Sequence, residues 1–278
     1  MPAESVIHDI GYQRYTGPRL GRAYATRSLF VHGLRAAFGL GRSAKAKIFP
    51  WTVAGLIGVI ALIFAVAAAQ GEEVSYQDLP QVASVLILVF LAVVAPELVS
   101  RDLRNKTLPL YFSRPIHRRD YALAKLASLT CAVWLILAGP LTLIFAAGAF
   151  GGGDVWTDVR GLLSGYAVAA FYAVIFSALA LLIASIASRR AIAAGAIAAV
   201  FLVTLPVVGV LMEVGEGTVE QLAPLGSPVM LPEGIRTWVF HTGELEIGGF
   251  GPLYGAVGVL LPLACALLLL LRYRKVSL

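Results

Sequence analysis

The stretch PWTVAGLIGVIALIFAVAAA, residues 50–69, runs for twenty residues without a charged side chain. About 20 mainly apolar residues in a helix cross the roughly 30 Å hydrocarbon layer of a bilayer. The whole 278-residue chain has the same character, because 59% of its residues are apolar and only 14% are charged. Soluble domains average about 25% charged residues. This composition therefore excludes an ordinary soluble enzyme, a disordered chain and a nucleic-acid-binding domain.

Five further apolar stretches are long enough to cross a membrane. We predict six spans, at about residues 50–69, 81–98, 123–150, 161–187, 191–212 and 252–271. A backbone in lipid must satisfy its own hydrogen bonds, which favours helices. We therefore expect an all-α integral membrane protein with a cytoplasmic arm at residues 1–49, a transmembrane domain at 50–271 and a tail at 272–278.

The distribution of charge predicts the orientation. The arm, residues 99–125, the short turn at 188–190 and the tail together hold 20 of the 22 Lys and Arg residues. The opposite side keeps Arg160 and Arg236 and carries eleven acids. Basic residues gather on the cytoplasmic side of membrane proteins. We therefore expect a multi-pass protein of the cell membrane with both termini in the cytoplasm.

The arm contains a helical apolar period from about Thr26 to Gly41. Phe30, Leu34 and Phe38 fall on one face, and Arg35 and Arg42 fall on the polar side. Such a helix is expected to lie in the headgroup plane with its arginines against anionic lipid, and a bend at Ile48–Pro50 would form an elbow into the first span. A helix packed on a partner protein and a solvated arm are the alternatives.

The loop at residues 99–122, after the second predicted span, is the most informative segment. Glu97 closes an apolar run, where an unpaired carboxylate is costly, and Arg101 follows one helical turn later as a candidate partner. Pro109 and Pro115 divide the loop into a short amphipathic helix, a bend and the entry to the third span. Taken alone, these charges also fit a simpler role in setting topology and binding anionic lipid.

The same segment resembles the cytoplasmic signature of ABC-transporter permeases of the drug- and polysaccharide-export type. That signature combines an acid at the end of the second span, a basic–acidic pair, Gly-Thr-Leu, Ser-Arg-Pro and a Lys that opens the third span. The matching residues here are Glu97, Arg101, Asp102, Thr107, Leu108, Ser113, Arg114, Pro115, Tyr121 and Lys125. Lys106 stands where the family often has Gly, so the local turn departs from the family pattern.

The resemblance implies a permease subunit of an ATP-driven exporter, which works beside a second copy or a related permease. It implies that separate ATPase subunits, which bind ATP and Mg²⁺, dock on this loop. The candidate coupling residues are Glu97, Arg101, Asp102, Arg104, Lys106 and Thr107. The candidate interface or topology residues are Arg114, Arg118, Arg119 and Lys125. Membrane lipids are the remaining expected partners.

The sequence has no motif for bond chemistry. It has no Gly-x-x-x-x-Gly-Lys-Ser/Thr phosphate loop and no His-x-x-x-His or Cys-x-x-Cys spacing. We therefore expect a chain that is not an enzyme and that binds no cofactor, metal or nucleic acid. A membrane scaffold or regulator without transport is the first alternative. An ion-coupled carrier is disfavoured, because the candidate acids Glu97 and Glu213 lie at span ends.

Residues 213–250 form the longest segment on the side opposite the arm. Three prolines and several short apolar clusters make it unsuited to another span. Related exporters place re-entrant helices between their last two spans. Two short helices that dip into the outer leaflet and an ordinary surface loop are both compatible with this sequence.

Overall fold

The computed structural model describes residues 17, 20–72, 74–100, 102, 105, 111, 116–150, 154–187 and 189–275. These residues form helices and connecting turns, with no strand among them. Five helices are long and apolar enough to cross a membrane. This confirms the all-α class and the membrane-type composition of the chain.

The helices follow the predicted apolar stretches closely. Their bounds are α1 (Arg22–Ala37), α2 (Ala44–Ala69), α3 (Asp78–Val82), α4 (Ser84–Leu98), α7 (Arg118–Phe150), α8 (Val155–Ile186), α9 (Arg190–Val214), α10 (Thr218–Leu222), η1 (Ala223–Gly226), α11 (Leu231–Phe240), η2 (Gly248–Phe250) and α12 (Gly251–Lys275). The five long apolar helices are α2, α7, α8, α9 and α12. The second predicted span, 81–98, corresponds to the short helix α3 followed by the 15-residue helix α4.

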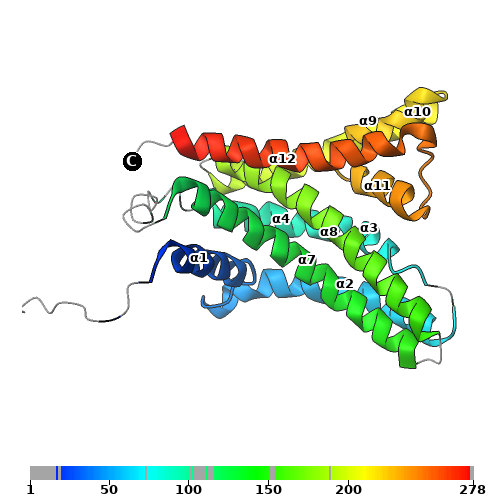
Figure 1. Cartoon of the computed structure of the whole chain (residues 1–278), viewed down its shortest axis with the longest axis horizontal. Helices are drawn as coiled ribbons and strands as arrows, with labels where there is room; N and C mark the ends of the chain where they lie inside the picture. The colour runs from blue at the N-terminus through cyan, green and yellow to red at the C-terminus, as the bar shows by residue number, and fades with distance from the viewer. Residues whose placement is uncertain are drawn as a thin grey trace, which may run out of the picture.

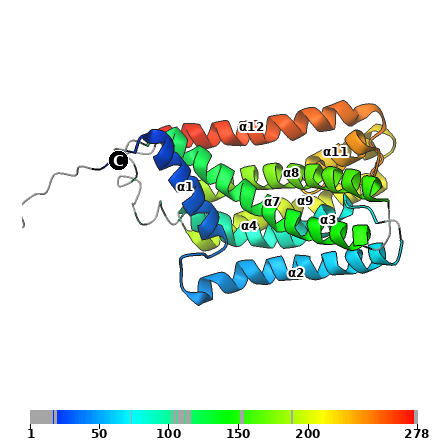
Figure 2. The same cartoon turned by 60° about the horizontal axis from the view of Figure 1, so that its bottom comes forward.

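The long helices run side by side, and α1 lies across one end of the bundle (Figures 1 and 2). Helix α8 is the most enclosed of them. In its most apolar stretch of 18 residues 61% is buried, against 22% in the corresponding stretches of α2, α9 and α12. It packs most extensively against α7, and α7 in turn packs against α1 and α2. The apolar core therefore lies around α7 and α8, and the peripheral helices turn apolar faces outward.

Helix α1 begins four residues earlier than the sequence predicts and ends before Phe38. Phe30, Leu34 and Phe38 are partly buried against the core, so the predicted apolar face is largely covered by other helices. A Cβ atom added to Gly33 would lie 2.9 Å from the Cβ atom of Ser128 in α7. Glycine at this position allows the two helices to approach closely.

The predicted bend at Ile48–Pro50 is wrong. Helix α2 already begins at Ala44 and continues through Pro50. The chain turns instead at residues 38–43, where Gly39 and Gly41 adopt φ angles of 67° and 82°. Glycine takes these left-handed conformations without the strain that a Cβ atom causes. A helix can continue through a proline with the loss of one backbone hydrogen-bond donor. Pro50 therefore does not end the helix or cause the chain to turn.

Residues 213–250 fold into short helices at the far end from α1. Helices α10 and η1 pack against α9, whereas α11 packs against α12 and α8. Leu231 and Ile235 on α11 are buried, while Trp238 and Val239 near its end are exposed at 39% and 45%. The rings of Tyr254 and Trp238 occupy the space that side chains would take at Gly234 and Gly255. Helix α11 is thus part of the packed bundle, and its later turn faces outward.

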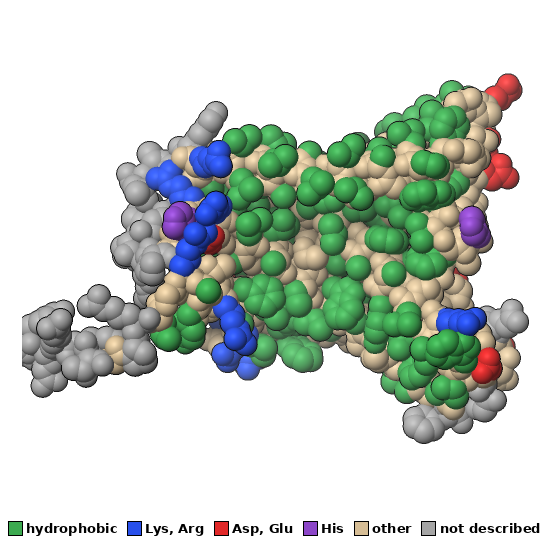
Figure 3. Space-filling model, viewed as in Figure 1, with side chains coloured by type: hydrophobic (Ala, Val, Ile, Leu, Met, Phe, Trp, Pro, Cys, Tyr) green, Lys and Arg blue, Asp and Glu red, His purple; other side chains and the backbone are tan. Residues whose placement is uncertain are grey.

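Charge separates along the bundle. On the face shown in Figure 3, Lys and Arg side chains gather at the end where α1 lies, and most of the visible acidic side chains lie at the opposite end. Hydrophobic side chains cover the surface between them (Figure 3). We refer below to the α1 end and the α11 end. An apolar band between two polar ends is the pattern that a bilayer requires of a spanning protein.

Candidate functional site

The α1 end holds a group of ionic contacts that joins segments distant in sequence. We call it the α1-end cluster; its members are Arg22, Arg42, Glu97, Asp102, Asp120, Lys125 and Arg190. These residues come from α1, the turn before α2, the end of α4, the following loop, α7 and α9. The cluster contains three of the residues predicted from the sequence motif, Glu97, Asp102 and Lys125.

Glu97 lies in the last turn of α4, and its side chain is 14% exposed. One carboxylate oxygen accepts a hydrogen bond from Nη1 of Arg42 at 2.5 Å. The other lies 2.7 Å from Nη1 of Arg190, at the start of α9. A carboxylate near the end of an apolar helix needs such cations, because its desolvation is costly. Glu97 therefore ties the turn before α2 and the start of α9 to α4.

Lys125 is the most enclosed charged residue of the cluster, with a side chain 5% exposed. Its ammonium group lies 2.9 Å from Oδ2 of Asp102 and donates a hydrogen bond to the backbone carbonyl of Leu98 at 2.8 Å. The hydroxyl of Tyr121 also donates to Oδ2 of Asp102, at 2.7 Å. The carbonyls in the last turn of a helix lack partners within the helix and favour a nearby cation. Lys125 thus caps α4 from α7 and neutralises the first acid of the following loop.

Arg22 and Asp120 fasten α1 to the first turn of α7. The guanidinium group donates two hydrogen bonds of 2.6 Å, one to each oxygen of the carboxylate. The backbone N–H of His117 donates to the same carboxylate at 3.0 Å. This paired geometry matches the planar fork of an arginine side chain and fixes direction as well as distance.

The last turns of α12 are bound to the same end. Tyr273 is buried, and its ring centroid lies 5.2 Å from that of Tyr121. Arg118 donates to the carbonyl of Arg274 at 2.6 Å, and Arg272 donates to the carbonyl of Ser185 in α8 at 2.6 Å. The C-terminal helix therefore contacts both α7 and α8 beside the cluster.

The surroundings of His32, on α1, reflect the positive charge at this end. Burial lowers the pKa of His32 from its ordinary value, and the charge of Lys125 lowers it further. The neutral imidazole of His32 is therefore favoured more than that of an ordinary histidine. The α1 end presents its positive charge through Arg and Lys side chains.

Several predicted residues fall outside the described part of the chain. They are Arg101, Arg104, Lys106, Thr107 and Arg114. Of the remaining candidates, Arg118 contacts the end of α12, while Arg119 and Arg35 are exposed. The Glu97 carboxylate is expected to reach the membrane surface or to find a cation, and in the structure it lies beside Arg42 and Arg190. Its predicted pairing with Arg101 stays a prediction.

Sequence reasoning missed the roles of Arg22, Arg42, Asp120 and Arg190. Arg42 was expected on the polar side of the arm helix, and Arg190 was counted only as a charge on the cytoplasmic side. Their partners are 55 or more residues away along the chain. One feature of the sequence does indicate that these residues could meet. Each of them lies within a few positions of a helix end at the same predicted membrane surface.

A second ionic group lies at the α11 end. Arg236 on α11 has a side chain only 3% exposed, and it forms ion pairs with Asp78 at the start of α3 and with Glu233 on its own helix. Burial raises the pKa of the Glu233 carboxyl, and the attraction of Arg236 opposes that rise. This group joins α11 to α3 much as the α1-end cluster joins α1 to α7.

Among the described residues, no group of three or more His, Cys, Asp or Glu side chains is arranged to hold a metal ion. The described side chains of the α1-end cluster hold the ends of several helices together. Comparison of the chain with models of protein families and with curated proteins finds no match.

Proposed function

We propose that this chain is the transmembrane permease subunit of an ATP-driven ABC exporter, with the substrate pathway formed together with a second permease and ATP hydrolysed by separate subunits. The observation that supports this most is the attachment of Asp102 to Lys125 and Tyr121. Asp102 belongs to the loop that resembles the ATPase-docking segment of exporter permeases. A segment that transmits force has to be fixed to the spans that it moves, and Asp102 is fixed to α7.

Six spans are part of this proposal. Helix α4 alone, at 15 residues, is about 22 Å long and falls short of the hydrocarbon thickness. Its backbone hydrogen bonds continue into α3, because Ala83 N–H donates to Leu79 and Ala83 accepts from Ile87, both at 2.9 Å. Residues 78–98 together extend about 31 Å at 1.5 Å per residue. We therefore count α3 and α4 as one span, the second.

The orientation follows from the charge at the two ends. Lys and Arg gather at the α1 end, which also receives the C-terminal end of α12 (Figures 1 and 3). The positive-inside rule then places the α1 end, with both termini, in the cytoplasm. Helix α1 lies across that end (Figure 2). We propose that it serves as the interfacial elbow helix, with the polar side at Arg35 toward the headgroups.

The first test isolates the chain with its partners. The full chain is tagged, cross-linked in native membranes and purified, and we expect a phosphate-loop ATPase in the complex. In proteoliposomes, Arg104→Glu in the proposed docking loop is expected to reduce ATP hydrolysis and transport severalfold. Glu246→Gln, an exposed change at the α11 end, is the matched control and leaves both unchanged.

Two results would contradict the proposal. A complex without any phosphate-loop ATPase, from membranes in which the chain is intact, would favour a scaffold or regulator. Transport that continues after ATP depletion and collapses with an ion gradient would favour an ion-coupled carrier. Cysteine labelling gives an independent check of orientation after Cys131 and Cys265 are replaced by Ala. A cysteine at Arg35 should react only from the cytoplasm, and one at Glu216 only from outside.

A further inference from the structure

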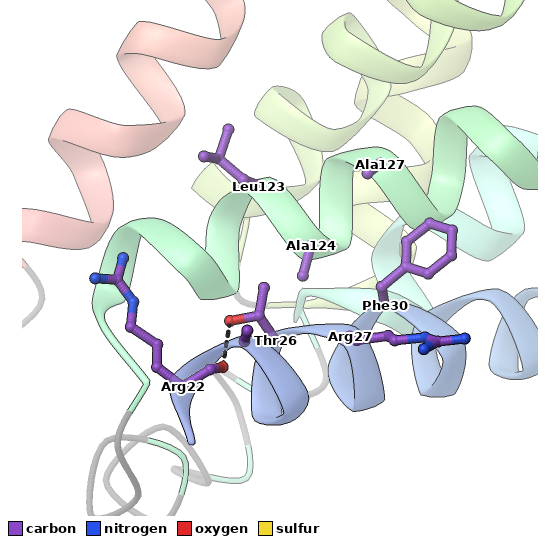
Figure 4. A pocket seen from close by; sticks show the side chains of 8 residues that line it. Arg22, Thr26, Arg27, Phe30, Leu123, Ala124 and Ala127 are labelled. Carbon is purple, nitrogen blue, oxygen red and sulfur yellow. Dashed lines mark hydrogen bonds between the residues drawn. The ribbon is translucent and has the colours of Figure 1, made fainter. Parts of the chain in front are cut away.

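A groove of about 720 Å³ lies between α1 and the beginning of α7. Figure 4 shows Thr26 and Phe30 on the side of α1 that faces α7, and Ala124 on the side of α7 that faces α1; Leu123 and Ala127 also line the groove. Three alanines, Phe30 and Leu123 form the apolar part of its wall, and Leu123 is 47% exposed. Its volume lies within the usual range of sites for small ligands. The groove is therefore an open apolar channel beside a helix that crosses the membrane.

The two arginines that border the groove differ in their bonding. Arg22 is held by both oxygens of Asp120. Arg27 is exposed, and in the described part of the chain it has no carboxylate partner. In Figure 4 its side chain extends along α1 at the margin of the groove. One edge thus carries a guanidinium group that no described carboxylate neutralises, beside apolar surface.

The position of the groove decides which molecule fits it. Leu123 follows Arg118, the first residue of α7, by five positions, which is about 7.5 Å along the helix. That depth is where the headgroups of a bilayer meet the acyl chains if α1 lies at the membrane surface. A phospholipid there would place apolar chain in the groove and its phosphate near Arg27. Arginine binds phosphate well, because its planar fork matches two phosphate oxygens.

We propose that this groove binds one anionic phospholipid of the surrounding bilayer, with Arg27 at the phosphate and the upper part of an acyl chain along Leu123, Ala124 and Ala127. When the lipid binds, its acyl chain moves from the hydrocarbon of the bilayer to the apolar wall of the groove. Burial of the chain therefore contributes little to the affinity or to the choice between lipids. Charge then sets selectivity, and anionic lipid is favoured over zwitterionic lipid. This inference rests on the proposed interfacial placement of α1, and it is independent of ATP-driven export.

The test uses the purified full chain without any ATPase. Delipidated protein in mild detergent receives equal amounts of phosphatidylglycerol and phosphatidylcholine, and native mass spectrometry counts the lipids retained. We expect one tightly retained phosphatidylglycerol, preferred about fivefold, the factor that corresponds to about 1 kcal/mol for one arginine near an anionic surface. Arg27→Gln should abolish the preference. Ala127→Leu should reduce retention of both lipids by filling the groove.

Arg35→Gln tests for general surface attraction, because Arg35 is exposed on the same helix and faces the headgroups in the proposed placement but does not line this groove. The same loss of preference with Arg35→Gln and Arg27→Gln would show general surface attraction and overturn the proposal. Displacement of the lipid by glycerol 3-phosphate would also overturn it, since the acyl chain would then be unnecessary. A dimer that Ala127→Leu dissociates, without change in lipid, would assign the groove to a second copy of the chain. Arg27→Gln remains informative if Ala127→Leu misfolds.

Discussion

The ammonium group of Lys125 lies 2.9 Å from the carboxylate of Asp102, and the same ammonium group donates to the carbonyl of Leu98 at 2.8 Å. One side chain on α7 therefore holds both the end of α4 and the first described residue beyond Ser100. Such a contact is sensitive to the loss of either partner, because the remaining charge stays largely enclosed.

We predict that Lys125→Met lowers the stability of the detergent-solubilised protein by about 3 kcal/mol, since Asp102 and the Leu98 carbonyl both lose their cation. Thermal unfolding monitored by intrinsic fluorescence measures the change. Combining Lys125→Met with Asp102→Asn should cost less than the sum of the two single changes, with a coupling of about 1–3 kcal/mol. Arg119→Gln, on the exposed side of α7, is the control. Strict additivity of the two changes would refute the contact.

Arg42 and Arg190, the cations described beside Glu97, should contribute unequally to stability. The side chain of Arg42 is 29% exposed and that of Arg190 is 57% exposed, so solvent screens the second pair more strongly. We predict that Arg42→Gln costs about 1 kcal/mol and that Arg190→Gln costs less. Chemical denaturation in mixed micelles provides the comparison. Neither change should alter stability further in a Glu97→Gln background, and a full additional loss there would contradict the pairing.

Glu233 predicts a pH dependence at the α11 end. Burial raises its pKa above the ordinary value of 4.5, against the attraction of Arg236. Between the pKa of Glu233 in the unfolded chain and its higher pKa in the folded chain, the folded chain holds a proton that the unfolded chain releases. The free energy of unfolding is therefore greatest below this pH range and falls as the pH rises through it. We expect the unfolding midpoint of Glu233→Gln to change less than that of the unaltered chain as the pH rises above 4.5, the ordinary pKa of a glutamate. Parallel curves for the two proteins would argue against a raised pKa.

The close approach of α1 to α7 at Gly33 limits the size of the side chain that position 33 can hold. Gly33→Val should push α1 away from Ser128 at a cost of about 1–3 kcal/mol, because a Cβ atom would lie 2.9 Å from the Ser128 Cβ atom. Limited proteolysis of the solubilised protein should then cut within α1 sooner. Gly55→Ala in α2 is the control, since its Cβ atom meets nothing within 4 Å. The double variant Gly33→Ala with Ser128→Gly should be more stable than Gly33→Ala alone. That result would show that the clash is between the side chains at positions 33 and 128.

The sequence predicted helices best where apolar composition alone determines them. The bounds of α9, Arg190–Val214, and of α12, Gly251–Lys275, extend the predicted spans 191–212 and 252–271 by a few polar or flanking residues. Helix ends extend past the apolar run because a backbone can stay helical beyond the hydrocarbon. The bend predicted at Ile48–Pro50 is wrong, because α2 runs through Pro50 and the chain turns at Gly39 and Gly41.

The candidate site was predicted in part. Glu97, Asp102 and Lys125 were found because a local motif contains all three within 29 residues. Arg22, Arg42, Asp120 and Arg190 were not found as partners, because their contacts depend on how separate helices are placed side by side. Periodicity within one helix carries no information about such placement. The ion pairs of Arg236 are of the same kind.

The unequal enclosure of the helices limits how two copies of this chain could be arranged. Most of the apolar stretch of α8 is buried within one molecule, so little of its apolar surface can contact a second copy. The apolar stretches of α2, α9 and α12 are mainly exposed. A test of the proposed translocation route between two copies should accordingly place its cross-linking cysteines on those three helices. Residues on α8 are better used as reporters of whether a single copy keeps its shape during the proposed transport cycle.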